Sequence, residues 1–149
     1  MKKWIKSLGV IAFAGLSLVS CSKDDDGGPF TFNESDLYGR WDFSKESFTV
    51  NGAGTPEVDY TGNEVGCNKD FISFATAGNG VEGDYDGNDC TLFDDAFTWT
   101  KTGNDILVNF GGGDTTTFTV LSVNATNLVI QTTETEGSGT FVSTYKLIK

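Results

Sequence analysis

The stretch AFTWTKTGNDILVNF, residues 96–110, shows most clearly how this chain folds. Apolar side chains occupy every second position on either side of the turn sequence TGND: Phe97, Trp99, Ile106, Val108 and Phe110. Residues two apart lie on the same face of a β-strand, so the pattern predicts two strands joined by a tight turn. We therefore expect a β-hairpin with one apolar face.

The same alternation recurs along the chain between short turns rich in Gly and Asn. It predicts eight strands and a weaker ninth segment at Val58–Tyr60; the eight lie at about residues 41–50, 70–76, 81–85, 96–101, 106–110, 115–123, 128–134 and 141–149. A change of parity in the first indicates a bulge near Lys45–Ser47, and GNG at 78–80 has the composition of a hairpin turn. Closing a sheet removes its exposed edges, so we expect an all-β fold, a single antiparallel up-and-down β-barrel of about eight strands over residues 35–149.

The N-terminal residues have the composition of a secretion signal. Three lysines precede the apolar run Leu8–Val19, whose twelve residues are too few to span a bilayer. The tetrad LVSC at 18–21 resembles the end of a bacterial lipoprotein signal, in which the cysteine becomes the acylated first residue of the mature chain. We expect residues 1–20 to be removed and Cys21 to anchor the protein to a membrane by lipid. The alternative is an ordinary cleaved signal followed by a chance cysteine.

Residues 21–34 have the composition of a flexible acidic tether. Within them, Lys23, Asp24 and Asp25 resemble the surface-export signal of Bacteroidetes lipoproteins. The location implied is the outer membrane, with the lipid-anchored domain facing the cell surface. The alternative is that these charges only keep the tether solvated.

Cys67 and Cys90 are the remaining cysteines of the chain. An exported protein folds in an oxidising compartment, so a disulfide between them is expected. It would close a loop of about 23 residues. A metal site or a reactive thiol is the alternative, but the chain contains neither a histidine nor a CxxC motif to support it.

Several motifs, in order, resemble the lipocalin-like domains of Bacteroidetes lipoproteins: LYGRW, CNKDFISF, FTWTKTGNDILV, FTVLSVNATNLVI and YKLIK. The resemblance extends over residues 37–149. It implies that Gly39 and Trp41 close one end of the barrel, with Lys146 or Lys149 over the tryptophan ring. The aspartate–tyrosine pair of a second lipocalin motif has no clear counterpart, because VDY at 58–60 comes too early.

An eight-stranded barrel has room for its own side chains or for one small ligand. The candidate residues for a small apolar cavity, capped by Trp41, are large: Phe43, Phe74, Phe97, Trp99, Phe118 and Tyr145. The function inferred is a surface-anchored lipoprotein that binds a small apolar ligand. The alternatives have a filled barrel and no ligand: a loop-mediated surface interaction, a glycan-associated accessory role, or inhibition of an envelope enzyme.

Charge and composition disfavour other classes of function. The chain has a formal net charge of −11, or −14 without residues 1–20, which disfavours binding to nucleic acid. Without histidine or a recognisable acid–base pair, neither an enzyme nor a cofactor is expected. Asp84, Asp86 and Asn88 have the spacing of a calcium loop, but Asp89 stands where that loop needs glycine, so no metal site is expected. We expect a monomer.

Overall fold

The structure is a computed structural model that describes residues 30–149. These residues form one short helix, one 3₁₀ turn and ten strands: α1 (Glu34–Leu37), β1 (Gly39–Val50), β2 (Ala53–Gly54), β3 (Val58–Asp59), β4 (Phe71–Phe74), η1 (Thr76–Gly78), β5 (Asn79–Asp86), β6 (Thr91–Thr102), β7 (Asp105–Gly111), β8 (Asp114–Val123), β9 (Asn127–Glu136) and β10 (Gly139–Ile148). The fold is therefore all-β, as the alternation of apolar residues predicts.

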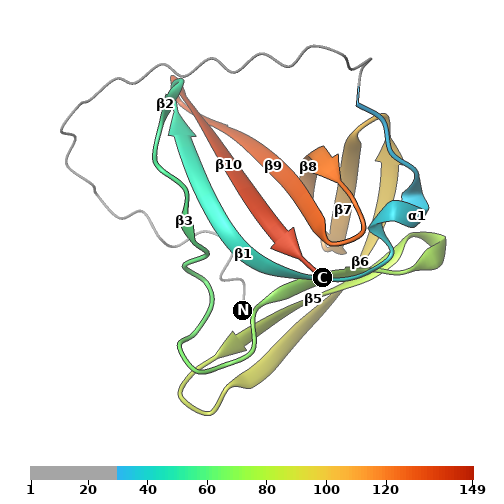
Figure 1. Cartoon of the computed structure of the whole chain (residues 1–149). Helices are drawn as coiled ribbons and strands as arrows, with labels where there is room; N and C mark the ends of the chain where they lie inside the picture. The colour runs from blue at the N-terminus through green and yellow to red at the C-terminus, as the bar shows by residue number, and fades with distance from the viewer. Residues whose placement is uncertain (1–29) are drawn as a thin grey trace.

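Eight of the strands form a closed antiparallel barrel (Figure 1). From β4 to β10 each strand pairs with the next along the chain, β4 also pairs with β1, and β10 closes the barrel on β1. The two-residue strands β2 and β3 pair with β1 beyond the point where β4 ends. The predicted up-and-down barrel is confirmed, and the weak segment at Val58–Tyr60 contains β3.

Two features differ slightly from the sequence pattern. The bulge of β1 lies between Phe43 and Lys45, because there the Phe43 N–H donates to the Asp70 carbonyl and the Ser44 carbonyl accepts from Tyr60. The reversal before β5 lies in η1 and not at 78–80, because Ala77 and Gly78 adopt positive φ and Asn79 already belongs to the strand. Both differences arise from contacts distant in sequence or from backbone angles that composition does not reveal.

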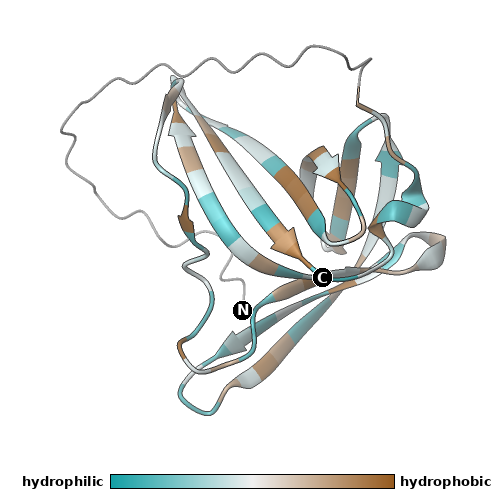
Figure 2. Cartoon of the chain, viewed as in Figure 1, coloured by the Kyte–Doolittle hydropathy of each residue, from teal (hydrophilic) through white to brown (hydrophobic). Residues whose placement is uncertain are grey.

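The hydrophobic core fills one end of the barrel. Fifteen buried apolar residues form a single cluster to which β1, β4 and β6 to β10 contribute, and Figure 2 shows the apolar bands on these strands. Phe32 and Leu37, from the segment that contains α1, belong to the same cluster. The expected boundary between tether and barrel at residue 35 therefore falls inside a segment that is already packed from Phe32 onward.

The other end of the barrel is open because neighbouring strands separate. β6 pairs with β7 only from Thr98 onward, and β8 pairs with β9 only from Thr119 onward. The β5–β6 hairpin accordingly extends away from β9 and β10 (Figure 1). The closed end and the open end thus present different environments for a ligand.

Candidate functional site

Trp41 closes the filled end of the barrel. Its ring is fully buried, its Nε1 donates to the Leu37 carbonyl at 2.6 Å, and Lys149 Nζ lies 4.1 Å from the ring centroid. The same ammonium donates to the Tyr38 carbonyl at 2.9 Å. Lys149 is therefore the cation over Trp41. Lys146, the other candidate, forms an ion pair with Glu57 instead.

Gly39 adopts a backbone conformation that favours glycine. Its φ of 110° is one that L side chains rarely adopt, whereas a Cβ there would meet Lys149 Cε at an ordinary 3.5 Å. The glycine two residues before Trp41 thus has a backbone reason and not a packing one.

Five of the six residues proposed for the cavity lie in the packed core, with exposed fractions between 0 and 4%: Phe43, Phe74, Phe97, Trp99 and Phe118. The Phe74 ring meets Phe97 at 5.8 Å and Trp99 at 5.4 Å between centroids, both edge to face. Such contacts are a favourable arrangement of aromatic rings. The rings therefore fill the closed half of the barrel.

Tyr145, the sixth, is only partly buried and belongs to a cluster on the barrel wall. The Phe43 ring stacks on Tyr60 at 4.7 Å and meets Tyr145 edge to face at 5.7 Å. Burial raises the pKa of both tyrosines, so their hydroxyl groups stay neutral. Beside them the buried Glu46 carboxylate accepts hydrogen bonds from the Thr61 N–H and hydroxyl. β4 pairs with β1 only over residues 39–42. Beyond that point β3 and the loop that contains Tyr60 lie along β1 instead.

A hollow opens on the wall where β6 leaves β7. It has a volume of about 320 Å³ and is lined by Asn79, Ala96, Phe97, Thr98, Asn109, Phe110 and Gly111. The Phe97 and Phe110 rings meet edge to face at 5.5 Å and present apolar surface at its base. The Asn79 carbonyl accepts a 2.9 Å hydrogen bond from Trp99 Nε1, which fixes this side of the hollow to the core.

Of these lining residues, the sequence pattern had proposed only Phe97 for a cavity. Phe110 shares its parity with Ile106 and Val108, so the alternation placed it inside the barrel without showing that it lies at the open end. The sequence did not indicate Asn79, because the group that binds Trp99 is its main-chain carbonyl and not its side chain.

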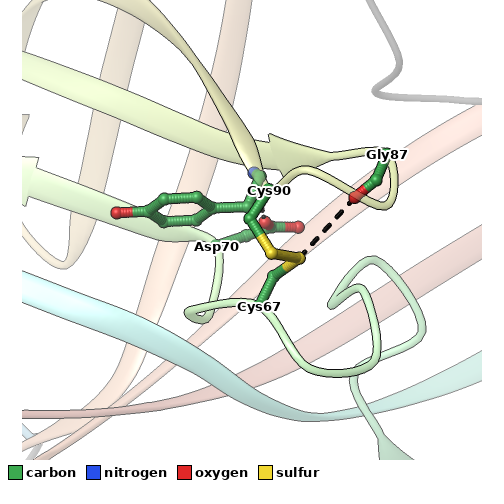
Figure 3. Close-up of a disulfide and its surroundings, with 5 residues drawn as sticks. Cys67, Asp70, Gly87 and Cys90 are labelled. Carbon is green, nitrogen blue, oxygen red and sulfur yellow. Dashed lines mark hydrogen bonds between the residues drawn. A yellow bond between two sulfur atoms is a disulfide. The ribbon is translucent and has the colours of Figure 1, made fainter.

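The disulfide between Cys67 and Cys90 is present, with a Cα–Cα distance of 5.3 Å, as predicted. It joins the loop before β4 to the turn between β5 and β6 (Figure 3). A Cys67 sulfur lies 3.7 Å from the Gly87 carbonyl oxygen of that turn. The covalent link therefore holds the β5–β6 hairpin to the loop before β4.

Asp70 lies close to the disulfide and is almost fully buried (Figure 3). Its Oδ1 accepts a 2.8 Å hydrogen bond from the Tyr85 N–H, and its own N–H donates to Asn63. Burial raises the pKa of the Asp70 carboxyl to about 6, against the effect of the Tyr85 hydrogen bond and with a contribution from Asp84.

The sequence matches the lipocalin-like domain family over residues 37–130, well over half of the chain. The chain belongs to the lipocalin-like domain family. Its structure is similar to a lipocalin-like protein from Bacteroides uniformis, with a TM-score of 0.53 and 16% identity over 76% of this chain and 98% of that one. That likeness shows a shared fold. No curated protein sequence gives a significant match.

A second solved structure is similar to this lipocalin-like domain at a lower level. It is a triple mutant of bovine odorant-binding protein, with a TM-score of 0.45 and 18% identity over 77% of this chain and 74% of that one.

The remaining predicted sites of this lipocalin-like protein lie outside the described residues: Cys21, Lys23, Asp24 and Asp25. Within residues 30–149, no helix has the length and apolar character needed to cross a membrane. The same residues contain no group of three or more Asp, Glu, Cys or His side chains placed to hold a metal ion.

Proposed function

We propose that this lipocalin-like domain binds one small, largely apolar molecule at the open end of its barrel. The observation that carries the proposal is the hollow between β6 and β7, where the Phe97 and Phe110 rings form an apolar base. Barrels of this size hold a small ligand when their own side chains do not fill them, and here the filled part is the closed half. Membership of the lipocalin-like family supports the same assignment.

The chemistry of the hollow suggests what such a molecule would be. Apolar surface removed from water contributes roughly 25 cal/mol per Å², so the two phenylalanine rings favour an aromatic or aliphatic group. Asn79 and Asn109 border the same hollow and offer amide groups to one polar atom of the ligand. The ligand class is therefore apolar with a single polar substituent.

A fluorescence titration tests this proposal. N-phenyl-1-naphthylamine, a neutral probe that fluoresces in apolar surroundings, is titrated into the domain comprising residues 30–149. We expect saturable binding at one site and at least about tenfold weaker binding in Phe110→Asp, because a carboxylate there would be desolvated by the probe. The matched control is Leu107→Asp on the outer face of the same strand, where the side chain is 45% exposed.

Equal affinity of both variants would contradict a site at Phe110. Circular dichroism of each variant shows whether it folds, and Phe110→Ala provides a milder change if Phe110→Asp does not.

We further propose that lipid on Cys21 attaches the domain to the outer membrane and that Lys23, Asp24 and Asp25 direct it to the cell surface. The support is the order of the lysines, the apolar run and LVSC at 18–21, followed by the acidic tether. Cys21→Ser is expected to release the protein from the membrane fraction or leave it unprocessed.

Replacing residues 23–25 by alanine is expected to protect the attached protein from protease added to intact cells. A processed, membrane-bound Cys21→Ser protein would contradict the lipid anchor, and unchanged protease sensitivity would reduce residues 23–25 to a plain tether.

A further inference from the structure

The β6 strand has a free edge at the open end of the barrel. Its residues 91–97 pair with β5 on one side, whereas the ladder with β7 on the other side begins only at Thr98. Within the described part of the chain, no other segment forms a backbone ladder with residues 91–97 on that second side. The six residues Thr91–Ala96 are all exposed.

Hairpin geometry shows which main-chain groups face the free edge. The two-residue turn after β6 makes Thr102 and Asp105 a hydrogen-bonded pair, and such pairs recur at every second residue of an antiparallel ladder. By the same alternation, three residues before Thr98 direct their N–H and C=O groups to the edge that does not pair with β7: Leu92, Asp94 and Ala96. This edge can therefore accept the hydrogen bonds of another strand.

The side chains on this edge combine apolar surface with negative charge. Leu92 and Phe93 are 43% and 58% exposed, so the two adjacent side chains present apolar surface to solvent near the start of β6. Asp94 and Asp95 follow them, and Asp95 lies opposite Glu82 of β5 in the ladder. The ion pairs found within residues 30–149 involve Asp42, Asp59 and Glu57, so neither Asp94 nor Asp95 belongs to one of them.

These charges determine which strand the edge can accept. Two copies of β6 pairing antiparallel would bring the two aspartates of one copy next to those of the other, and like charges across a ladder are destabilising. A strand with basic side chains at the same positions would instead pair favourably with Asp94 and Asp95 on its two faces. Apolar side chains on either side of the basic ones would cover Leu92 and Phe93.

We propose that the free edge of β6 binds an extended, basic segment of a partner protein by β-strand addition. This function uses the main chain of residues 91–97, whereas the small-molecule proposal uses apolar side chains; the two surfaces share Ala96 and Phe97. The β5–β6 hairpin projects from the barrel body (Figure 1), and the six residues Thr91–Ala96 on this edge are exposed.

The probe is a fluorescein-labelled peptide of eight residues with two adjacent lysines flanked by valine, isoleucine and threonine, measured by fluorescence anisotropy with the full-length chain. Two companion peptides separate the contributions. One carries glutamates in place of the lysines, and the other keeps the lysines but has N-methyl groups on alternate amides. We expect saturable binding of the lysine peptide alone, since the first companion reverses the charge and the second cannot complete the ladder.

Variants of the chain locate the site. Ala96→Pro removes one N–H from the free edge without removing a hydrogen bond to β5, and should weaken binding by roughly tenfold. The matched control is Thr135→Pro on β9, whose residues 132–136 also pair on one side only. The double change Asp94→Lys and Asp95→Lys should abolish binding of the lysine peptide and create binding of the glutamate peptide.

Three results would overturn the proposal. Binding of the N-methylated peptide as tightly as the lysine peptide would show charge attraction without a ladder. A loss of binding in Thr135→Pro but not in Ala96→Pro would place the site on β9. Dimerisation of the unliganded chain in sedimentation equilibrium, abolished by Ala96→Pro, would make a second copy the occupant of the edge.

Discussion

Trp41 shows at the residue scale how contacts from both ends of the domain converge on one side chain. Leu37 and Tyr38 lie just before the first long strand, and Lys149 is the last residue of the chain. The sequence predicted the role of Trp41 because its neighbours Gly39 and Arg40 form a recognisable local motif. It left Lys146 and Lys149 as alternatives, because only the register of β10 determines which one reaches the ring.

Lys149→Ala is expected to lower the free energy of unfolding by about 1 kcal/mol, the sum of a lost cation–π contact and a lost hydrogen bond to Tyr38. Lys149→Arg, which keeps the charge, should cost less. Urea denaturation of both variants measures the difference. A Lys149→Ala protein as stable as the wild type would show that the ammonium contributes nothing to closing the barrel.

Asp70 could not be recognised from the sequence as an unusual carboxyl group. Its burial and its hydrogen bond to Tyr85 exist only when the loop before β4 packs against β5. One of many acidic residues thus acquires a distinct environment through tertiary structure alone.

The raised pKa of Asp70, about 6 against an ordinary value of 3.8, predicts a pH dependence of stability. The folded state holds this proton more tightly than the unfolded state, so Asp70 makes the domain more stable as the pH falls through 6 towards 3.8. Asp70→Asn should remove this gain, while the exposed Asp89→Asn should retain it. Melting temperatures from pH 7.5 to 4.5 measure both, and parallel curves for wild type and Asp70→Asn would contradict the raised pKa.

At the element scale, alternation of apolar residues was sufficient to predict the strands where they have a buried face, but it missed residues 91–95, the exposed start of β6. It was insufficient to predict how far neighbouring strands stay paired. The first seven residues of β6, 91–97, precede the start of its ladder with β7, and the sequence shows no break at Thr98. The extent of pairing is a property of two strands together, which the alternation within one strand does not encode.

Gly80 is the element-scale feature that allows the core rings to meet across β5. A Cβ at this position would overlap the Phe97 ring and lie 2.7 Å from the Ser73 carbonyl oxygen. Gly80→Ala is therefore expected to destabilise the domain by about 1–3 kcal/mol through overpacking.

The matched control for Gly80→Ala is Gly54→Ala on β2, where the added Cβ would meet Thr49 at an ordinary 3.5 Å. Thermal denaturation compares the two variants. An equal shift in both would show that the packing of Phe97 over β5 does not need the glycine.

The disulfide links two elements that the barrel ladder does not join. Replacing both Cys67 and Cys90 by serine should lower the free energy of unfolding by roughly 3 kcal/mol, the chain-entropy value for a loop of 23 residues. Urea denaturation of the double variant, alongside wild type treated with a reducing agent, measures this. Unchanged stability in both would mean that the loop and the hairpin are held by their noncovalent contacts.

At the scale of the whole molecule, the domain has few cations, most of which contact a carboxylate or a ring, and many carboxylates. Residues 30–149 contain six basic side chains, and five of them have ion-pair or ring contacts: Arg40, Lys45, Lys101, Lys146 and Lys149. The excess of carboxylates keeps such a domain soluble and disfavours anionic partners. The sequence predicted this charge balance and the barrel, since both depend on composition and periodicity.

Whether the barrel interior is filled could not be predicted from the sequence, because large inward residues are compatible with a lined cavity and with a packed core. The structure places five of the six candidates in the core, and of these Phe97 also lines the hollow at the open end together with Phe110. The hollow forms at the open end because residues of β6 before Thr98 do not pair with β7.

The central claim is that a small apolar molecule binds at this open end. Its most direct test is the mapping of amide chemical shifts by nuclear magnetic resonance while N-phenyl-1-naphthylamine is titrated into residues 30–149. The account predicts saturable shifts concentrated at Asn79, residues 96–98 and residues 109–111, with the closed-end amides of Ile72 and Leu147 unmoved. Saturable shifts centred on the closed end, or no saturable shifts at all, would contradict it.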